Sequence, residues 1–290
     1  MKIGLGTAQF GMDYGITNKS GCVSNHEARK ILSMASKYNI NMIDTAYAYD
    51  RSEKKLGALI NAGDEFNIVT KIPPLKETIN PVRAAKEMFK LSLKYLRCNN
   101  LYGLIVHAAE DLTGSYGDEL WEFMSNLKSQ GYVKKIGVSI YDCNVIEPLL
   151  NKYSLDLIQV PCNLFDQRLL QGGQLAMLKS KGVEIHARSI FLQGLLLEDP
   201  EDLPDNFDPI IGPLRNLRMA FSELGLTPLS ALVSFVHNLT EIDNIIVGVT
   251  TSTQLQEIID SLDDKLKVSD FSSFAINDEK IINPSLWKLH

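Results

Sequence analysis

The chain has few of the features that mark metal-binding or disulfide-stabilised proteins. Its 290 residues include five histidines without metal-ligand spacing, and four cysteines that form no Cys-x-x-Cys pair: Cys22, Cys98, Cys143 and Cys162. Widely separated cysteines in a chain of this length are typical of reduced thiols in a cytosolic protein. The sequence therefore argues against a disulfide framework and against a zinc site, and predicts that no metal is bound.

Clusters of positive charge and long apolar runs are also missing. The formal net charge is −6 and no block of Lys or Arg occurs, so nothing indicates a nucleic-acid partner. No apolar run approaches the length of a membrane span, and residues 1–6 show no cleavable signal. We therefore expect a cytoplasmic protein without a membrane or nucleic-acid partner. Its oligomeric state leaves no signal in the sequence.

The composition is that of an ordinary globular protein, with 45% hydrophobic and 22% charged residues. Eight short apolar runs are candidate strands: Ile3–Leu5, Asn41–Ile43, Asn67–Thr70, Leu101–Val106, Lys135–Ser139, Leu157–Val160, Val183–Ala187 and Asn244–Val247. Longer segments with helical periodicity lie between them, including Pro81–Arg97, which begins with a proline suited to a first helical turn.

This alternation predicts a single (β/α)8 TIM barrel, an α/β fold. An open doubly wound sheet is the alternative, but Gly4, Gly6 and Gly11 do not have the spacing of a dinucleotide fingerprint. We expect one domain over residues 1–290. A long loop is expected over residues 198–213, and a tail after about residue 264.

Four polar residues fall at or just beyond the ends of predicted strands: Asp44, Tyr49, Lys71 and His107. The carboxyl ends of barrel strands meet at one mouth, where active sites form, so these side chains are expected to converge. Each also has a simpler interpretation. Tyr49 could be a packing aromatic, with Tyr47 as a rival, Lys71 could be solvated, and His107 could be structural.

Together these residues suit the protonation of a carbonyl oxygen while hydride reaches the carbonyl carbon. Tyr49 would donate the proton, although a free phenol has a pKa of about 10. A Lys71 ammonium is expected to lower that pKa, and Asp44 to hold Lys71 in place. His107 would hydrogen-bond the carbonyl oxygen.

The sequence resembles the aldo-keto reductases. The resemblance rests on Gly4-Leu5-Gly6-Thr7, Ile43-Asp44-Thr45-Ala46 with Tyr49, Thr70-Lys71, His107, Lys135-Ile136-Gly137-Val138-Ser139 and Ile158-Gln159-Val160, and it spans residues 3 to about 263. It implies a (β/α)8 barrel, an extended nicotinamide cofactor and reduction of an aldehyde or ketone. Asp44, Tyr49, Lys71 and His107 are the implied catalytic residues.

The resemblance also implies a set of cofactor-binding residues. Ser139 and Gln159 would hold the nicotinamide carboxamide, although Ile140 stands where the family usually has Asn. Arg188 replaces a Tyr that often stacks on the ring. The remaining implied residues are Gly6, Thr7, Asp44, Ser189, Phe191, Gln193, Gly248, Thr250, Thr251 and Gln254.

The adenosine end decides between the two nicotinamide cofactors. Family members often pair the 2′-phosphate with Lys or Arg after the eighth strand, but residues 247–264 contain neither. Hydroxyl and amide groups of Thr250, Thr251 and Gln254 remain as candidate phosphate ligands. The resemblance favours NADP(H), and NAD(H) is the alternative.

The expected substrate is a small carbonyl compound, and a polar, sugar-like one is the leading candidate. Its pocket is expected to include Phe10, Tyr49, His107 and Ala108, and the small Ala108 indicates a wide site. Two other functions stay open: a Schiff-base aldolase-type barrel enzyme that uses Lys71, and a regulatory protein that binds cofactor without turnover.

Overall fold

A computed structural model describes residues 2–61, 63–203, 207–263 and 271–287. The eight strands form a closed parallel barrel in chain order. They are β1 (Ile3–Gly6), β2 (Met42–Asp44), β3 (Asn67–Ile72), β4 (Leu101–Val106), β5 (Val133–Ser139), β6 (Leu157–Pro161), β7 (Glu184–Arg188) and β8 (Asn244–Gly248). The predicted fold class is confirmed, and all eight predicted strands are present.

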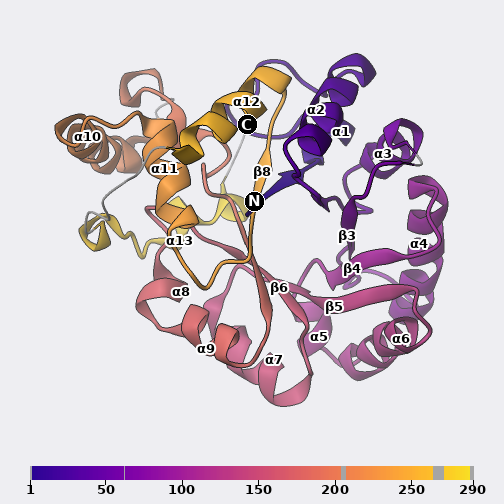
Figure 1. Cartoon of the computed structure of the whole chain (residues 1–290). Coiled ribbons are helices and arrows are strands. Elements are labelled where there is room, and N and C mark those ends of the chain that lie inside the picture. The colour runs from indigo at the N-terminus through magenta and orange to yellow at the C-terminus, as the bar shows by residue number, and fades with distance from the viewer. Residues whose placement is uncertain (1, 62, 204–206, 264–270, 288–290) are drawn as a thin grey trace.

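Helices surround the barrel (Figure 1). They are α1 (Ala8–Gly11), α2 (Asn25–Lys37), α3 (Ser52–Leu59), α4 (Pro81–Leu96), α5 (Glu110–Thr113), α6 (Gly117–Ser129), α7 (Ile146–Lys152), α8 (Arg168–Gln171), α9 (Gln174–Ser180), α10 (Asp208–Glu223), α11 (Pro228–His237), α12 (Ser252–Asp260) and α13 (Glu279–Ile282). Buried apolar residues on the inner faces of the longer helices pack against the outside of the strands.

Side chains fill the lower interior of the barrel. Met42, Val69, Ile105, Leu157 and Ile246, from five different strands, form a buried apolar cluster. Such layers close the inside of a TIM barrel, so the barrel is a packed core and not a channel. In TIM barrels the active site lies at the mouth formed by the carboxyl ends of the strands.

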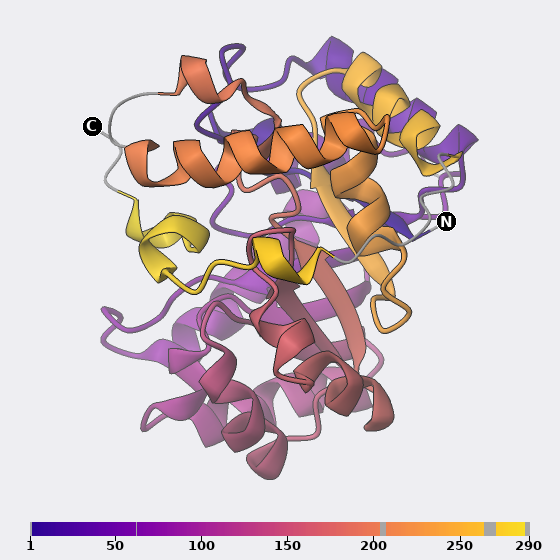
Figure 2. The same cartoon turned by 90° about the vertical axis from the view of Figure 1, so that its left-hand side faces the viewer.

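A second apolar cluster lies beside the barrel, where α10, α11 and α13 gather (Figures 1 and 2). Leu192 and Leu195 from the segment after β7 contribute to it, together with Phe271 from the C-terminal segment. This arrangement corrects the expected loop over residues 198–213, because α10 already begins at Asp208 and a short 3-10 turn covers Pro200–Asp202. Residues 204–206 and 264–270 of the expected loop and tail lie outside the described residues.

Among the described residues no single helix is long and apolar enough to cross a membrane. The bent pair α10 and α11 meets the length and composition together, with an angle of 89° between the helices.

Candidate active site

Lys71 lies near the carboxyl end of β3, and its position in the strand determines where its side chain points. Side chains alternate along a strand, so Thr70 faces the surrounding helices and Lys71 faces the barrel interior. There Lys71 Nζ lies 2.7 and 2.6 Å from the two carboxylate oxygens of Asp44, the last residue of β2. It also donates to the carbonyl oxygen of Thr45 at 2.8 Å. The side chains of Lys71 and Asp44 are only 1% and 5% exposed, so this is a buried ion pair.

Tyr49 is the aromatic residue that lies next to this ion pair. Its hydroxyl lies 3.4 Å from Lys71 Nζ, and its ring lies edge-on to the His107 imidazole with the centroids 6.0 Å apart. The rival Tyr47 is not part of the cavity lining, whereas Tyr49 is. The structure therefore brings Asp44, Tyr49, Lys71 and His107 together at the barrel mouth.

A buried hydroxyl network fixes the loop that carries Tyr49. Ser52 Oγ, at the start of α3, donates to the carbonyl oxygen of Thr7 at 2.8 Å, and Thr45 Oγ1 donates to Ser52 Oγ at 3.0 Å. Gly11 lies so close that a Cβ atom there would sit 1.8 Å from the Tyr49 carbonyl oxygen. Thr45, Ser52 and Gly11 were not predicted as site residues, because their role depends on contacts between β1, β2 and α3.

The titration behaviour of Tyr49 differs from the expectation. Burial, together with the Asp44 carboxylate, raises the pKa of Tyr49 above its ordinary value. The expected lowering of this pKa by Lys71 is wrong, since the Lys71 charge is balanced by Asp44 at 2.6 Å. Tyr49 is therefore a neutral phenol that carries its proton at neutral pH.

His107 and Lys71 are shifted in the opposite direction. Burial, with Lys71 and Arg188 nearby, lowers the pKa of His107 to about 3. The imidazole is neutral at pH 7 and has one N–H to donate. Burial also lowers the pKa of Lys71, while the Asp44 carboxylate opposes that shift.

Arg188, at the end of β7, lies on the aromatic ring of Tyr141, with its guanidinium carbon 3.8 Å from the ring centroid. Its two terminal nitrogens donate to the Ile140 carbonyl oxygen at 2.8 Å and to Ser189 Oγ at 3.2 Å. Within the described residues it forms no ion pair with a carboxylate. Stacking and hydrogen bonds therefore hold a cation beside the Tyr49 end of the cavity.

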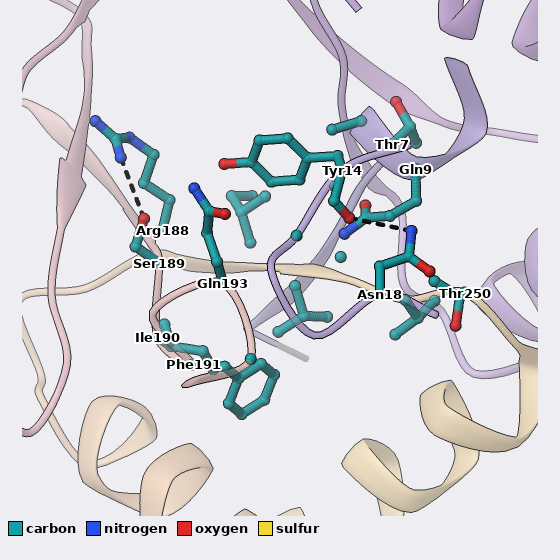
Figure 3. Close-up of a pocket in the computed structure, with 18 of the residues that line it drawn as sticks. Thr7, Gln9, Tyr14, Asn18, Arg188, Ser189, Ile190, Phe191, Gln193 and Thr250 are labelled. Atoms are coloured by element: carbon teal, nitrogen blue, oxygen red, sulfur yellow. Dashed lines mark hydrogen bonds between the residues drawn. The ribbon is translucent and has the colours of Figure 1, made fainter. Parts of the chain in front are cut away.

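A cavity of about 780 Å³ extends from Tyr49 and His107 across β1 to the loop after β8. Figure 3 shows Arg188 and Ser189 on one side and Asn18 and Thr250 on the other. The predicted cofactor residues that line it are Gly6, Thr7, Asp44, Gln159, Arg188, Ser189, Phe191, Gln193, Gly248, Thr250 and Gln254. The sequence did not predict that Tyr141, Lys19, Glu257, Pro284 and Ser285 would line it as well.

Five predicted residues lie outside the cavity lining, and one of them is Lys71, which is buried against Asp44. Phe10 is fully buried in the core, because its helix α1 turns the ring inward. Ser139 is buried, and Ala108 lies just past the mouth without lining it. Thr251 caps α12 by accepting a hydrogen bond from the Gln254 amide, so its hydroxyl is already engaged.

Gln159 lies at the centre of the mouth but faces the ion pair. Its Nε2 donates to Asp44 Oδ1 at 2.8 Å. The polar groups of the mouth thus form one connected set around Asp44.

The described residues contain no group of three or more His, Cys, Asp or Glu side chains that could hold a metal ion.

The cavity fits a nicotinamide dinucleotide. Its volume lies in the range of cofactor pockets. Gly6 and Gly248 line it, and because they carry no side chain, a ligand can approach their backbone atoms. A Cβ atom at position 248 would sit 2.6 Å from Gln9 Oε1. Thr7 and Ser189 also line it; the Thr7 hydroxyl donates to the Asp44 carbonyl oxygen, and the Ser189 hydroxyl accepts from Arg188.

Comparisons with known proteins agree with this geometry. A sequence profile of the Aldo/keto reductase family matches residues 2–278. An uncharacterized oxidoreductase of Bacillus subtilis, YqkF, is 27% identical over 266 residues, which cover 82% of this chain and 84% of the relative. The oxidoreductase sirO of Leptosphaeria maculans is 28% identical over 202 residues, covering 67% of this chain and 60% of the relative.

Solved structures share the fold. The holo form of the aldo-keto reductase AKR11C1 from Bacillus halodurans superposes with a TM-score of 0.74 at 19% identity, covering 94% of this chain and 90% of that chain. The glycerol dehydrogenase AKR11B4 from Gluconobacter oxydans gives 0.72 at 18% identity, covering 98% and 92%. The predicted resemblance is confirmed: the chain belongs to the aldo-keto reductase family of oxidoreductases, which act on small carbonyl compounds with nicotinamide cofactors.

Proposed function

We propose that the protein is an NAD(P)H-dependent carbonyl reductase that converts an aldehyde or ketone to its alcohol, with Tyr49 as general acid. The observation that carries this proposal is the neutral Tyr49 phenol, 3.4 Å from a buried Lys71–Asp44 ion pair and beside a neutral imidazole at the end of a long cavity. The bound cofactor would supply hydride to the carbonyl carbon. Family membership favours NADP(H), with NAD(H) as the alternative.

His107, Tyr49 and Lys71 have different roles at the carbonyl oxygen of the substrate. Negative charge grows on that oxygen as the carbon is reduced, and donors aimed at it lower the barrier. The neutral His107 donates an N–H and orients the substrate, while Tyr49 transfers its proton. Lys71 then stabilises the phenolate that remains, because its ammonium is the nearest cation.

Asp44 keeps Lys71 in position for this role. Both carboxylate oxygens are bound to Lys71, and one also accepts from Gln159. The same pairing argues against a Schiff-base enzyme, because Asp44 opposes the lowering of the Lys71 pKa by burial and so favours the protonated amine, which is a poor nucleophile. Gly6, Thr7, Ser189, Gln193 and the residues after β8 would hold the cofactor along the cavity.

The substrate end of the cavity is polar. Tyr14, Tyr141 and Arg188 line it together with Tyr49 and His107. We propose a polar carbonyl substrate such as a sugar-like compound, since phenol and guanidinium groups can hydrogen-bond hydroxyl substituents.

The test is oxidation of NADPH and NADH by the purified protein against a panel of aldehydes, ketoses and aldoses, with wild type and Tyr49→Phe side by side. Activity that falls about 10²–10⁴-fold in the variant, with unchanged cofactor affinity, supports the proposal. Tyr47→Phe is the matched control and should keep wild-type turnover. Borohydride trapping of substrate on Lys71 would instead support the aldolase alternative, and cofactor binding without turnover on any substrate would support the regulatory one.

A further inference from the structure

Glu53, on the first turn of α3, is a buried carboxyl group outside the barrel that neither lines the cavity nor touches the mouth. The residue is 2% exposed, and within the described part of the chain it forms no ion pair. Charged side chains are almost never fully buried unless they are paired. The groups that surround Glu53 therefore indicate what it does.

Hydroxyl groups bind this carboxyl group in place of a cation. Thr70 Oγ1, on the outer face of β3, donates to Glu53 Oε1 at 2.6 Å. Burial raises the pKa of Glu53, and hydrogen bonds from Thr70 and from Ser92 on α4 oppose that rise, because donors favour the ionised carboxylate. Glu53 thus connects β3, α3 and α4, which lie next to one another on one side of the barrel (Figure 1).

These contacts join the loop that carries Tyr49 with the strand that carries Lys71. Thr70 precedes Lys71 in β3, and the two side chains leave the strand on opposite faces. On the other side, Glu53 follows Ser52, whose backbone amide donates to the Tyr49 carbonyl oxygen at 2.9 Å. Inside the barrel Lys71 Nζ and the Tyr49 hydroxyl are 3.4 Å apart. Glu53 therefore ties together, from outside, the two segments whose side chains must meet inside.

Glu53 is also the second carboxyl group that acts on Lys71. Burial lowers the pKa of Lys71, and Arg188 lowers it further. The carboxylate of Asp44 opposes this shift most strongly, and Glu53 opposes it as well. Lys71 thus has Asp44 on the inner side of β3 and Glu53 on the outer side.

The other titratable groups near this arrangement carry no charge at neutral pH. Tyr49 and His107 are neutral beside Lys71. Around Glu53, burial raises the pKa of Tyr47, and it raises the pKa of Cys98 to about 11. The charges that bear on Lys71 are therefore those of Asp44, Glu53 and Arg188.

We propose that Glu53 is a positioning residue for the reaction: through Thr70 it holds Lys71 beside Tyr49, and its carboxylate helps to keep the Lys71 amine protonated. This inference rests on the proposed function and gives Glu53 no contact with substrate or cofactor. A protonated Lys71 stabilises the phenolate that Tyr49 becomes after proton transfer. Loss of the Glu53 charge should therefore make turnover more sensitive to high pH.

The test is the pH profile of kcat for wild type and Glu53→Gln. The variant removes the charge but keeps an oxygen that can accept from Thr70. We expect kcat within about twofold of wild type at pH 6 and at least about threefold lower at pH 9, because the alkaline limb moves to lower pH. Glu87→Gln, which removes the exposed partner of Arg83 on α4, is the control and should leave the profile unchanged.

Thr70→Val separates the hydrogen bond from the charge, because it removes the donor and leaves Glu53 in place. We expect a lower kcat across the whole pH range, with the alkaline limb where wild type has it. Wild-type kcat in this variant would overturn the role of the Thr70 contact, including in the case that Glu53→Gln does not fold.

A titration of Lys71 by nuclear magnetic resonance of isotope-labelled lysines gives a measurement without turnover, with Lys71→Met to assign the signal. We expect Lys71 to lose its proton at lower pH in Glu53→Gln than in wild type. The same titration and the same alkaline limb in both proteins would overturn the inference. Absence of turnover by wild type on every carbonyl substrate would instead refute the proposed function, and the Lys71 titration would still decide whether Glu53 acts on Lys71.

Discussion

The protonation states of two side chains determine what the mouth of the barrel can do. Tyr49 keeps its proton because it is buried beside Asp44, and His107 stays neutral because it is buried near Lys71 and Arg188. A neutral phenol and a neutral imidazole both donate hydrogen bonds to an oxygen without prior deprotonation. Under the proposed function, both groups are therefore ready to donate to a carbonyl oxygen at neutral pH.

The lowered pKa of His107 predicts a pH-dependent stability. The unfolded imidazole binds a proton near pH 6.5, and the folded one only near pH 3. The unfolded state therefore binds more protons between these values, and stability falls as pH decreases. At about 1.4 kcal/mol per pKa unit, this group contributes up to roughly 3 kcal/mol of that loss between pH 6.5 and pH 4.

Urea unfolding of wild type and His107→Gln at several pH values measures this contribution. The wild-type free energy of unfolding should fall more steeply below pH 6.5 than that of the variant. His237, whose pKa burial also lowers, is present in both proteins and cancels in the difference. Two parallel curves would show that folding does not lower the pKa of His107.

Arg188 should influence which redox form of the cofactor binds better. Its guanidinium is held beside the Tyr49 end without a carboxylate partner in the described part of the chain. A fixed cation disfavours the positively charged oxidised nicotinamide, by about 4 kcal/mol for unit charges ~4 Å apart at an effective dielectric of ~20 and by less when screened.

Replacing Arg188 by Tyr removes that charge. We expect the dissociation constant of the oxidised cofactor to fall relative to that of the reduced one, measured by titration of both forms. An unchanged ratio together with a raised substrate KM would contradict this expectation and make Arg188 a substrate ligand.

At the scale of secondary-structure elements, the hydroxyl network couples stability to the site. Ser52 is fully buried and links β1, β2 and α3 through Thr7 and Thr45. Ser52→Ala leaves the Thr45 hydroxyl without this acceptor and should cost about 1–3 kcal/mol. Because the Ser52 hydroxyl also holds the loop that carries Tyr49, kcat should fall as well.

Chemical denaturation and steady-state kinetics of Ser52→Ala check both effects. Ser222→Ala, an exposed position on α10, serves as the control and should change neither. A variant with wild-type stability and kcat would show that the network does not position Tyr49.

The elements that the sequence predicted best are those that depend on local pattern. The eight strands follow from short apolar runs, and their order fixes the barrel because parallel strands need helical crossovers. Phe10 was misplaced as a pocket residue because the direction of a side chain on the four-residue α1 cannot be read from strand periodicity. The expected loop over residues 198–213 was too long, because its proline and aspartate content is typical of a loop whereas α10 begins at Asp208 and includes Pro213.

At the scale of the whole molecule, the missing information concerned contacts between distant segments. Asp44, Tyr49, Lys71 and His107 could be predicted because strand ends converge in any (β/α)8 barrel. Glu27 meets Ser252 across 225 positions of the chain, and Pro284 reaches the cavity from the C-terminal segment. No local pattern marks such pairs, and their discovery required the folded chain.

The central claim is direct hydride transfer to a carbonyl carbon with proton donation by Tyr49. A single-turnover reaction with cofactor deuterated at the transferable position of the nicotinamide tests it most directly, with mass spectrometry of the alcohol. We predict one deuterium on the new carbinol carbon, and formation of that product about 10²–10⁴-fold more slowly in Tyr49→Phe. An alcohol without deuterium, or labelled alcohol formed by Tyr49→Phe at the wild-type rate, would contradict the account.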